Sequence, residues 1–277
     1  VVGELALALV VLSAAGLLVR SVRALGSADL AFDASRLVVA ELALRTDVYD
    51  SPPKQREVVE RLLPAIATIP GVDAVSPVVA APFSGAHGWD GQLAAEGQSP
   101  QDAAGNPMLN MEVVAPSYFG TFGLPVLRGR AITADDREGG PPVIVVSQST
   151  ARHFWPDEDA VGKRLTLGPA AARRAFTVVG VVPDTRYRDL RTARPSVYFP
   201  LAQSFFPFVP TTLVLRTRDA RLDPSAAVER VLGETAPGVA LARAARLATL
   251  MEGPLAQPRL NAILLAAFAS AAVALAA

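Results

Sequence analysis

The sequence predicts an α+β domain held between two membrane-spanning helices. The chain has 277 residues, 51% of them hydrophobic, and the apolar excess is concentrated at its two ends. The middle alternates short β-rich runs with amphipathic helical stretches, and Gly and Pro residues fall at most of the junctions. A chain of this length accommodates one or two globular units of ordinary size.

Both ends carry apolar runs of membrane-spanning length. The first 19 residues include a single charge, Glu4, and Leu260–Ala277 has none. About 20 apolar residues span the hydrocarbon core of a bilayer. We therefore predict a transmembrane helix over residues 1–25 and the start of a second over 259–277, with both ends cut from a longer polypeptide. A buried Ala-rich helix is the alternative for the second run, since alanine contributes little to membrane insertion.

A strand-helix-strand unit is predicted directly after the first span. Leu37–Leu44 is a short apolar run typical of a strand, and Val72–Ala80 has the same character. Between them, Gln55–Ile69 repeats apolar residues at intervals of three and four, which builds one buried stripe on a helix. Pro70 and Gly71 end this helix.

The same order of elements returns near the end of the chain. Thr211–Arg216 and Val239–Ala244 are predicted strands, and Ala226–Leu232 is the helix between them. The turn Ile69-Pro70-Gly71-Val72 also parallels Ala236-Pro237-Gly238-Val239. We therefore predict a repeated strand-helix-strand subdomain built from about 30–88 and 201–255, whose two halves pack together.

The region between the two units, about 89–200, is predicted to be an inserted β-rich subdomain. Two short helices fit its pattern, Pro116–Phe122 and Gln148–Phe154. Its short β runs are bounded by Gly and Pro, and they cover Gln92–Glu96, Met108–Val114, Val143–Val146, Arg164–Leu167, Phe176–Val182 and Val197–Phe199.

Charge and composition exclude several classes of function. The 26 basic and 26 acidic side chains cancel, whereas a nucleic-acid-binding domain carries a basic surface, so no nucleic-acid partner is expected. No cysteine is present, which excludes disulfides and thiolate metal sites. No P-loop sequence occurs, so any energy from ATP must come from another polypeptide.

No catalytic, cofactor-binding or metal-ligating residue is predicted. Ser84, His87 and Asp90 share one Gly-rich turn, whereas a catalytic triad is assembled from distant segments. His87 and His153 lack the spacing of a zinc site. The acidic cluster Asp157–Asp159 lacks the alternating ligands of a calcium loop. We therefore expect a protein that is not an enzyme and binds no cofactor.

The side of the membrane is left open by the charges. Arg20 and Arg23 follow the first span, and by the positive-inside rule they favour a cytoplasmic middle region. That rule governs short loops, however, and large domains cross the membrane largely regardless of charge.

Six stretches, taken in their order along the chain, carry a resemblance to a known family. They resemble the MacB-type periplasmic core domain of FtsX-like ABC permeases, above all the duplicated orphan permeases whose chains carry this unit twice. The stretches are Ala14–Ser21, Ala31–Asp33, Leu124–Arg130, Phe154–Pro156 with Val161–Leu165, Val178–Asp184 and Leu255–Asn261.

The resemblance implies a non-catalytic permease of the bacterial inner (plasma) membrane, with residues 30–255 extracytoplasmic. In the implied mechanism, a separate ABC ATPase drives motion that the outer domain couples to transport or extrusion across the envelope. The implied partners are the lipid bilayer, the ATPase subunit, a second permease unit (a dimer mate or an internal duplicate) and a periplasmic protein.

Two other functions fit parts of the sequence. The first is an FtsX-type signalling or scaffold permease, which regulates a cell-wall hydrolase and transports nothing. The second is a membrane-anchored enzyme, for which the loop Phe83–Asp90 is the place to look.

Overall fold

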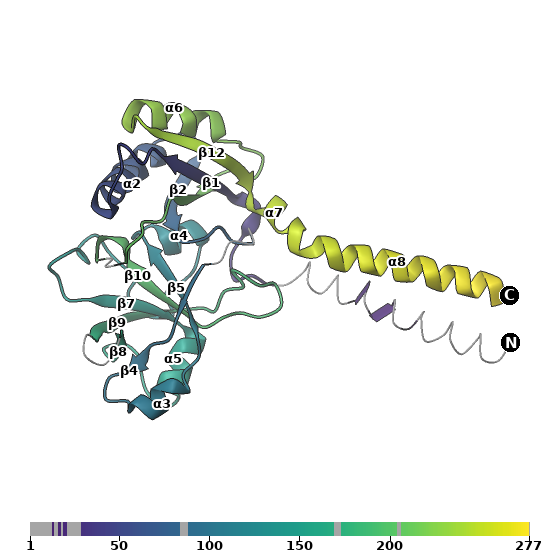
Figure 1. Ribbon diagram of the computed structural model, residues 1–277, viewed down its shortest axis with the longest axis horizontal. Helices are drawn as coiled ribbons and strands as arrows, with labels where there is room; N and C mark the ends of the chain where they lie inside the picture. Colours follow the sequence, from purple (N-terminus) through teal and green to yellow (C-terminus); the bar gives the residue numbers. More distant parts are fainter. Residues whose placement is uncertain are drawn as a thin grey trace.

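The protein is described by a computed structural model (Figure 1). The structure describes residues 29–83, 88–168, 173–203 and 206–276, together with Ser13, Gly16, Leu17, Val19 and Arg20. The predicted transmembrane helix over residues 1–25 therefore lies outside the described residues, apart from those five positions.

A four-stranded antiparallel sheet forms one unit of the fold, with the strand order β12-β1-β11-β2. Helix α2 connects β1 to β2, and helix α6 connects β11 to β12. Each strand-helix-strand unit is thus split by a strand of the other, so the two units interlock. The strands are β1 (Leu37–Leu44), β2 (Val72–Val78), β11 (Thr212–Thr217) and β12 (Val239–Arg246).

Both helices cover the same face of this sheet, at the top of Figure 1. Helix α2 (Pro52–Ala67) begins with Pro52 in its first turn, where the missing N–H costs no hydrogen bond. Its apolar stripe and that of α6 (Ser225–Thr235) pack on alternate residues of the strands. The buried residues of this layer include Val38, Ala40, Leu42, Val58, Leu62, Ile66, Leu213, Leu215, Val228 and Leu232.

The second unit is an eight-stranded sheet with the order β3-β5-β10-β7-β9-β8-β4, and β6 pairs with β9. Its two ends, β3 and β4, are consecutive in the chain and are separated only by Gln92 and Leu93. Because such a connection reaches only about 10 Å, the sheet must curl into a nearly closed barrel. The strands are β3 (Trp89–Gly91), β4 (Ala94–Ala95), β5 (Leu109–Val114), β6 (Arg128–Gly129), β7 (Val143–Ser147), β8 (Arg164–Leu167), β9 (Arg174–Val182) and β10 (Ser196–Pro200).

Apolar side chains fill the barrel and a second cluster joins it to the first sheet. The barrel core includes Leu109, Met111, Ile144, Phe176 and Phe199. Residues on the opposite pleat of the same strands, such as Val114 and Val145, belong instead to a cluster shared with Val39 and Val214 of the four-stranded sheet. The two sheets are therefore packed through one continuous apolar layer.

Short helices and one long helix complete the described fold. Helix α8 extends away from the two sheets (Figure 1). Among the described residues, no helix combines the length and apolar character needed to cross a membrane. The predicted second span at 259–277 overlaps α8, and its membrane role stays a prediction. The elements are η1 (Ala34–Arg36), α3 (Pro100–Ala104), α4 (Tyr118–Phe122), α5 (Gln148–Phe154), η3 (Leu201–Gln203), α7 (Leu247–Leu250) and α8 (Glu252–Ala276).

The predicted α+β class is confirmed, and individual elements differ in how well they were predicted. The bounds of β1, β8 and α5 match the sequence prediction, whereas the strand predicted at Gln92–Glu96 is wrong except at Ala94–Ala95. Strand β3 was not predicted, because Trp89–Gly91 shows no alternation of its own. It exists through antiparallel pairing with β5, from Trp89 opposite Met111 to Gly91 opposite Leu109.

Candidate functional site: the junction of the two sheets and the terminal helix

The chain enters and leaves the folded unit at one place. Helix η1, which precedes β1, contacts helix α7, which follows β12. Helix α7 also contacts β1 and leads directly into α8. Helix α8 is therefore connected, through α7, to the point where the chain enters the four-stranded sheet.

Hydrogen bonds fix the geometry of residues 29–36, which precede β1 and which we call the entry segment. The Asp33 carboxylate accepts hydrogen bonds from the Ser35 hydroxyl (2.6 Å) and backbone N–H (3.0 Å), and from Arg36 Nε (3.3 Å). The bond from the Ser35 hydroxyl is the main cause that lowers the pKa of Asp33. Asp33 is thus the N-cap that orients η1 against α7.

An aromatic cluster, which we call the junction cluster, belongs to the same apolar core as helix α7. It consists of Tyr118, Phe119 and Phe122 of α4 with Tyr187 and Tyr198. Ring centroids lie 4.7 Å apart for Tyr118–Phe122, 5.5 Å for Tyr118–Tyr198 and 5.7 Å for Phe122–Tyr187. Burial raises the pKa of all three tyrosines, so they are neutral near pH 7. The cluster therefore packs as a rigid, uncharged core.

Helix α7 belongs to the same core as the junction cluster. Its residues Leu247 and Leu250 are buried in the apolar layer that also contains Phe122, Val39 and Val145. One short helix, which contacts β1 and β12 of the four-stranded sheet, thus belongs to an apolar layer that also includes side chains of the barrel.

The loop from Pro183 to Pro195 ties the entry segment to both sheets. The Arg186 guanidinium donates to the carbonyl oxygen of Asp29, and the Arg186 backbone N–H donates to that of Leu30 (3.4 Å). The Tyr187 hydroxyl donates to the carbonyl oxygen of Ala80, which follows β2 (2.7 Å). Consecutive residues of this loop therefore hold the entry segment and the four-stranded sheet.

Arg188, the next residue of the loop, holds the edge of the barrel. Its guanidinium donates to Asp90 Oδ1 (2.6 Å) and to the Trp89 carbonyl oxygen (3.3 Å). Arg194 donates to the other oxygen of Asp90 (3.1 Å). A Cβ atom on Gly88 would lie 1.7 Å from an Arg188 nitrogen. The Arg188 guanidinium can therefore keep this position only if residue 88 is glycine.

Glu112 on β5 completes the network from inside the fold. Its side chain is 0% exposed, and Arg188 Nη2 lies 3.6 Å from its Oε1. Its Oε2 accepts a hydrogen bond from the backbone N–H of Val79, which follows β2 (3.0 Å). Burial raises the pKa of Glu112 to about 7, more than the Val79 hydrogen bond and Arg188 lower it. One carboxyl group therefore connects the barrel, the first sheet and the loop.

Of Ser84, His87 and Asp90, which the sequence analysis considered together, the structure describes only Asp90. Ser84 and His87 lie outside the described residues, and Asp90 is held by Arg188 and Arg194. Both carboxylate oxygens of Asp90 are therefore engaged in ion pairs, one with Arg188 and one with Arg194.

The other residues weighed as ligands have local structural roles. His153 Nε2 lies 3.4 Å from Asn106 Oδ1, and its ring packs against Phe154. Within the acidic cluster, Asp159 accepts the backbone N–H of Val161 (3.0 Å), as in a turn. Over the described ranges, no group of three or more His, Cys, Asp or Glu side chains is placed to hold a metal ion.

Sequence reasoning missed Glu112, Arg186 and Arg188. One signal was available for Glu112, because it is the only charged residue in the apolar run Met108–Val114. A charge inside a buried strand needs a partner. The identity of that partner depends on the fold, which brings the loop onto β5.

The chain belongs to a family of permease domains. A model of the family described as "MacB-like periplasmic core domain" matches residues 5–249, and the chain is therefore a member of this family. This confirms the resemblance found in the sequence, and it makes the chain a periplasmic core domain of the MacB/FtsX-like ABC permeases.

Two curated relatives share part of the sequence. Both are described as "Macrolide export ATP-binding/permease protein MacB". The protein of Aggregatibacter actinomycetemcomitans is 31% identical over 75 residues, 27% of this chain and 11% of that protein. That of Mannheimia succiniciproducens is 25% identical over 91 residues, 33% of this chain and 13% of that protein. The matched part of the chain thus spans only about a tenth of these relatives' length.

Solved structures of low sequence identity align with most of the chain. The periplasmic region of MacB from Actinobacillus actinomycetemcomitans has a TM-score of 0.49 at 15% identity, covering 80% of this chain and 94% of that one. The extracellular domain of the noncanonic ABC-type transporter YknZ from Gram-positive bacteria has a TM-score of 0.45 at 16% identity, covering 74% and 100%.

Proposed function

We propose that residues 30–255 are the extracytoplasmic domain of an ABC-type efflux permease of the bacterial inner membrane. The domain performs no chemistry. It receives motion driven by a separate ATPase and couples it to extrusion across the envelope. The observation that carries this proposal is that α8 leads through α7 into the apolar layer shared by both sheets.

Motion of α8 has a defined route into the domain. Because Leu247 and Leu250 of α7 are buried in the apolar layer that also contains the junction cluster, a shift of α7 displaces that cluster. Tyr187 contacts Phe122 in that cluster, and its neighbour Arg188 holds the barrel edge. Packed interfaces of this kind respond by switching between discrete arrangements.

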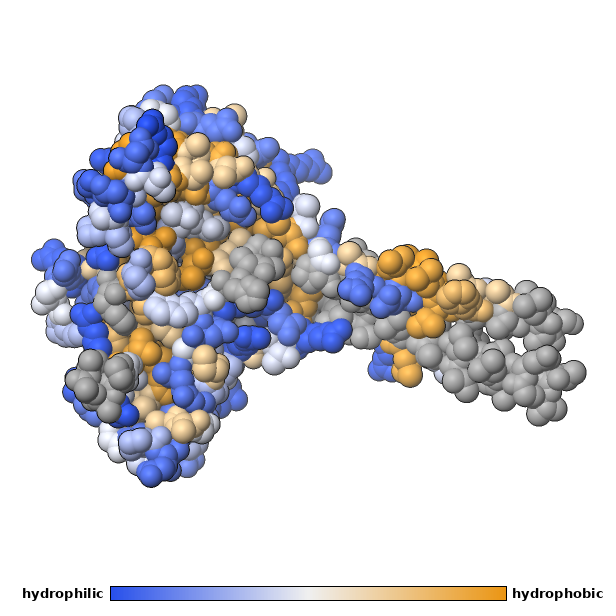
Figure 2. All heavy atoms as spheres, in the orientation of Figure 1, coloured by the Kyte–Doolittle hydropathy of each residue, from blue (hydrophilic) through white to orange (hydrophobic). Residues whose placement is uncertain are grey.

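Helix α8 has the surface of a helix that contacts lipid or other helices. Figure 2 shows apolar side chains gathered on the middle of the projecting helix. The large hydrophobic residues exposed on α8 include Leu260, Ile263, Leu264 and Phe268. We assign residues 259–277 to the start of a transmembrane helix, and residues 1–25 to another. A second permease unit, as a dimer mate or an internal duplicate, and a periplasmic protein are the proposed partners.

The proposal includes an internal repeat with an insertion. In each strand-helix-strand unit, the helix is followed by an equivalent turn before the second strand, at Gly71 (φ 85°) and Gly238 (φ 95°), where a left-handed backbone favours glycine. All described strands of the barrel lie between 89 and 200. This supports a repeated subdomain at about 30–88 and 201–255, and an inserted one at about 89–200.

Matched insertions test whether α7 and α8 transmit motion. Two glycines inserted between Met251 and Glu252 break the rigid link without changing the buried core. Two glycines inserted after Gly97, an exposed turn residue with open space around it, serve as the control. The permease is reconstituted with its ATPase in liposomes, and ATP hydrolysis, efflux and the melting temperature are measured.

We expect the insertion at Met251 to abolish efflux while the melting temperature and basal ATP hydrolysis stay unchanged. The control insertion should leave all three unchanged. Efflux at the normal rate with the insertion at Met251 would contradict the coupling route. If the insertion at Met251 instead removes activation of a cell-wall hydrolase and no substrate is ever moved, the FtsX-type signalling alternative replaces transport.

A further inference from the structure

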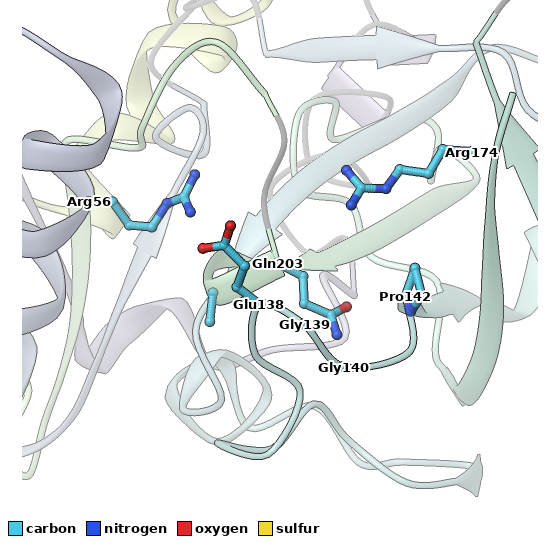
Figure 3. A pocket seen from close by; sticks show the side chains of 8 residues that line it. Arg56, Glu138, Gly139, Gly140, Pro142, Arg174 and Gln203 are labelled. Atoms are coloured by element: carbon cyan, nitrogen blue, oxygen red, sulfur yellow. The ribbon is translucent and has the colours of Figure 1, made fainter. Parts of the chain in front are cut away.

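A cavity of about 140 Å³ lies where helix α2 meets the barrel (Figure 3). Arg56 of α2 lines one side, and the opposite side comes from the loop before β7, the start of β9 and η3. Val59, nearly one turn beyond Arg56, is buried within the barrel core. The helix that carries Arg56 is therefore fixed in place on the barrel.

The wall opposite Arg56 is held rigidly by Gln203. Its side-chain oxygen accepts the backbone N–H of Val143 (3.1 Å), and its side-chain nitrogen donates to the carbonyl oxygens of Pro141 (2.9 Å) and Arg137 (3.3 Å). These bonds fix the loop that contains Glu138. The cavity is thus preformed, which lowers the entropic cost of binding.

The lining of the cavity is positively charged. Arg56 and Arg174 enter from different sides in Figure 3, the first from the four-stranded unit and the second from β9 of the barrel. Glu138 is the one acidic side chain among the described lining residues. Guanidinium groups keep their charge at every physiological pH, and their planar donors match the oxygens of phosphate and carboxylate.

The geometry points to a binding site for a phosphate group in this cavity, with oxygens directed to Arg56 and Arg174. Since about 10–15 Å³ of such space holds one water, the volume suits a phosphate with its remaining waters and excludes a large drug-like molecule. The oxygens of phosphate point in four tetrahedral directions, whereas the two oxygens of a carboxylate lie in one plane. Phosphate can therefore bind guanidinium groups on two different walls more readily than a carboxylate can. Bound phosphate would link the four-stranded unit to the barrel.

Calorimetry on the full chain in dodecyl maltoside micelles tests this site. Inorganic phosphate is titrated at constant ionic strength, set with sodium chloride, into the unaltered chain and four variants. Arg56→Gln and Arg174→Gln should each weaken binding at least tenfold, and Glu138→Gln should tighten it. Arg173→Gln is the matched control, because this exposed neighbour of Arg174 lines a different cavity.

Melting temperatures provide a second readout that does not depend on heats of binding. Phosphate should raise the melting temperature of the unaltered chain and of the Arg173→Gln variant, but not of Arg56→Gln or Arg174→Gln. The proposal is overturned if phosphate fails to bind at tens of millimolar, or binds all variants equally. Binding of acetate but not phosphate would overturn the assignment to a phosphate group.

Discussion

Replacing Glu112 by glutamine should remove a loss of stability that the unaltered chain undergoes between about pH 4.5 and 8. The carboxyl group is fully buried, and burial raises its pKa from 4.5 to about 7. Glutamine has the shape of the protonated acid and keeps an oxygen for the backbone N–H of Val79. The substitution therefore removes only the ability to become charged.

The magnitude follows from linkage between proton binding and folding. Glu112 binds its proton more tightly in the folded chain than in the unfolded chain, so its contribution is fully present below about pH 4.5. It is lost as the pH rises through about 7. At about 1.4 kcal/mol for each pH unit between the two pKa values, the loss is about 3 kcal/mol.

Urea denaturation followed by tryptophan fluorescence measures the effect, because Trp89 lies on β3 beside Asp90. The free energy of unfolding of the unaltered chain, relative to Glu112→Gln, should fall by about 3 kcal/mol from pH 4.5 to 8. Carboxylates shared by both chains cancel in this difference. Glu96→Gln, which removes an exposed ion pair with Arg164, should change stability by less than about 1 kcal/mol. Parallel curves for the unaltered chain and Glu112→Gln would refute the reasoning.

Four further substitutions have defined outcomes in the same denaturation assay. Gly180→Ala should cost about 3 kcal/mol of stability, because its Cβ would lie 2.1 Å from the carbonyl oxygen of Arg130. Gly162→Ala is the control: no atom lies within 4 Å of its Cβ, and its φ of 86° should cost only about 1 kcal/mol. Equal costs for the two substitutions would contradict the clash. Asp136→Asn should cost about 2 kcal/mol at pH 7, because two hydrogen bonds from Arg130 (2.7 and 2.8 Å) lose their charged acceptor. Burial raises the pKa of Asp136, but these bonds outweigh it and lower the pKa, so the difference should shrink below about pH 4; a constant difference would rule out the ion pair as its source. Phe122→Ala should cost about 3–5 kcal/mol, and a cost below about 1 kcal/mol would show that the junction cluster is loosely packed.

Elements with a strong local pattern were predictable from the sequence. The strand Leu37–Leu44 and the helix Gln148–Phe154 have the predicted bounds, since each has its own apolar pattern and flanking signals. The two residues of β6 have no such pattern. They form a strand because Arg128 and Gly129 pair with Val181 and Gly180 of β9, which only the folded chain brings together.

The junction was less predictable than the fold. Part of its apolar half lies on elements that the sequence analysis predicted, the short helix Pro116–Phe122 and the β run Val197–Phe199. Its charged half depends on long-range contacts, since Arg188 reaches Asp90 and Glu112 across the fold. Nothing in the local sequence of the loop Pro183–Pro195 distinguishes these arginines from others on the surface.

The exposure of the domain on the outer face of the membrane is the central claim, and cysteine labelling tests it most directly. The chain contains no cysteine, so Gln101→Cys at an exposed position of α3 supplies a single thiol. Intact cells that express the full permease are treated with a membrane-impermeant maleimide, with lysed cells as the reference. Labelling in intact cells equal to that after lysis is the predicted result. Labelling that requires lysis would place residues 30–255 in the cytoplasm and contradict the account.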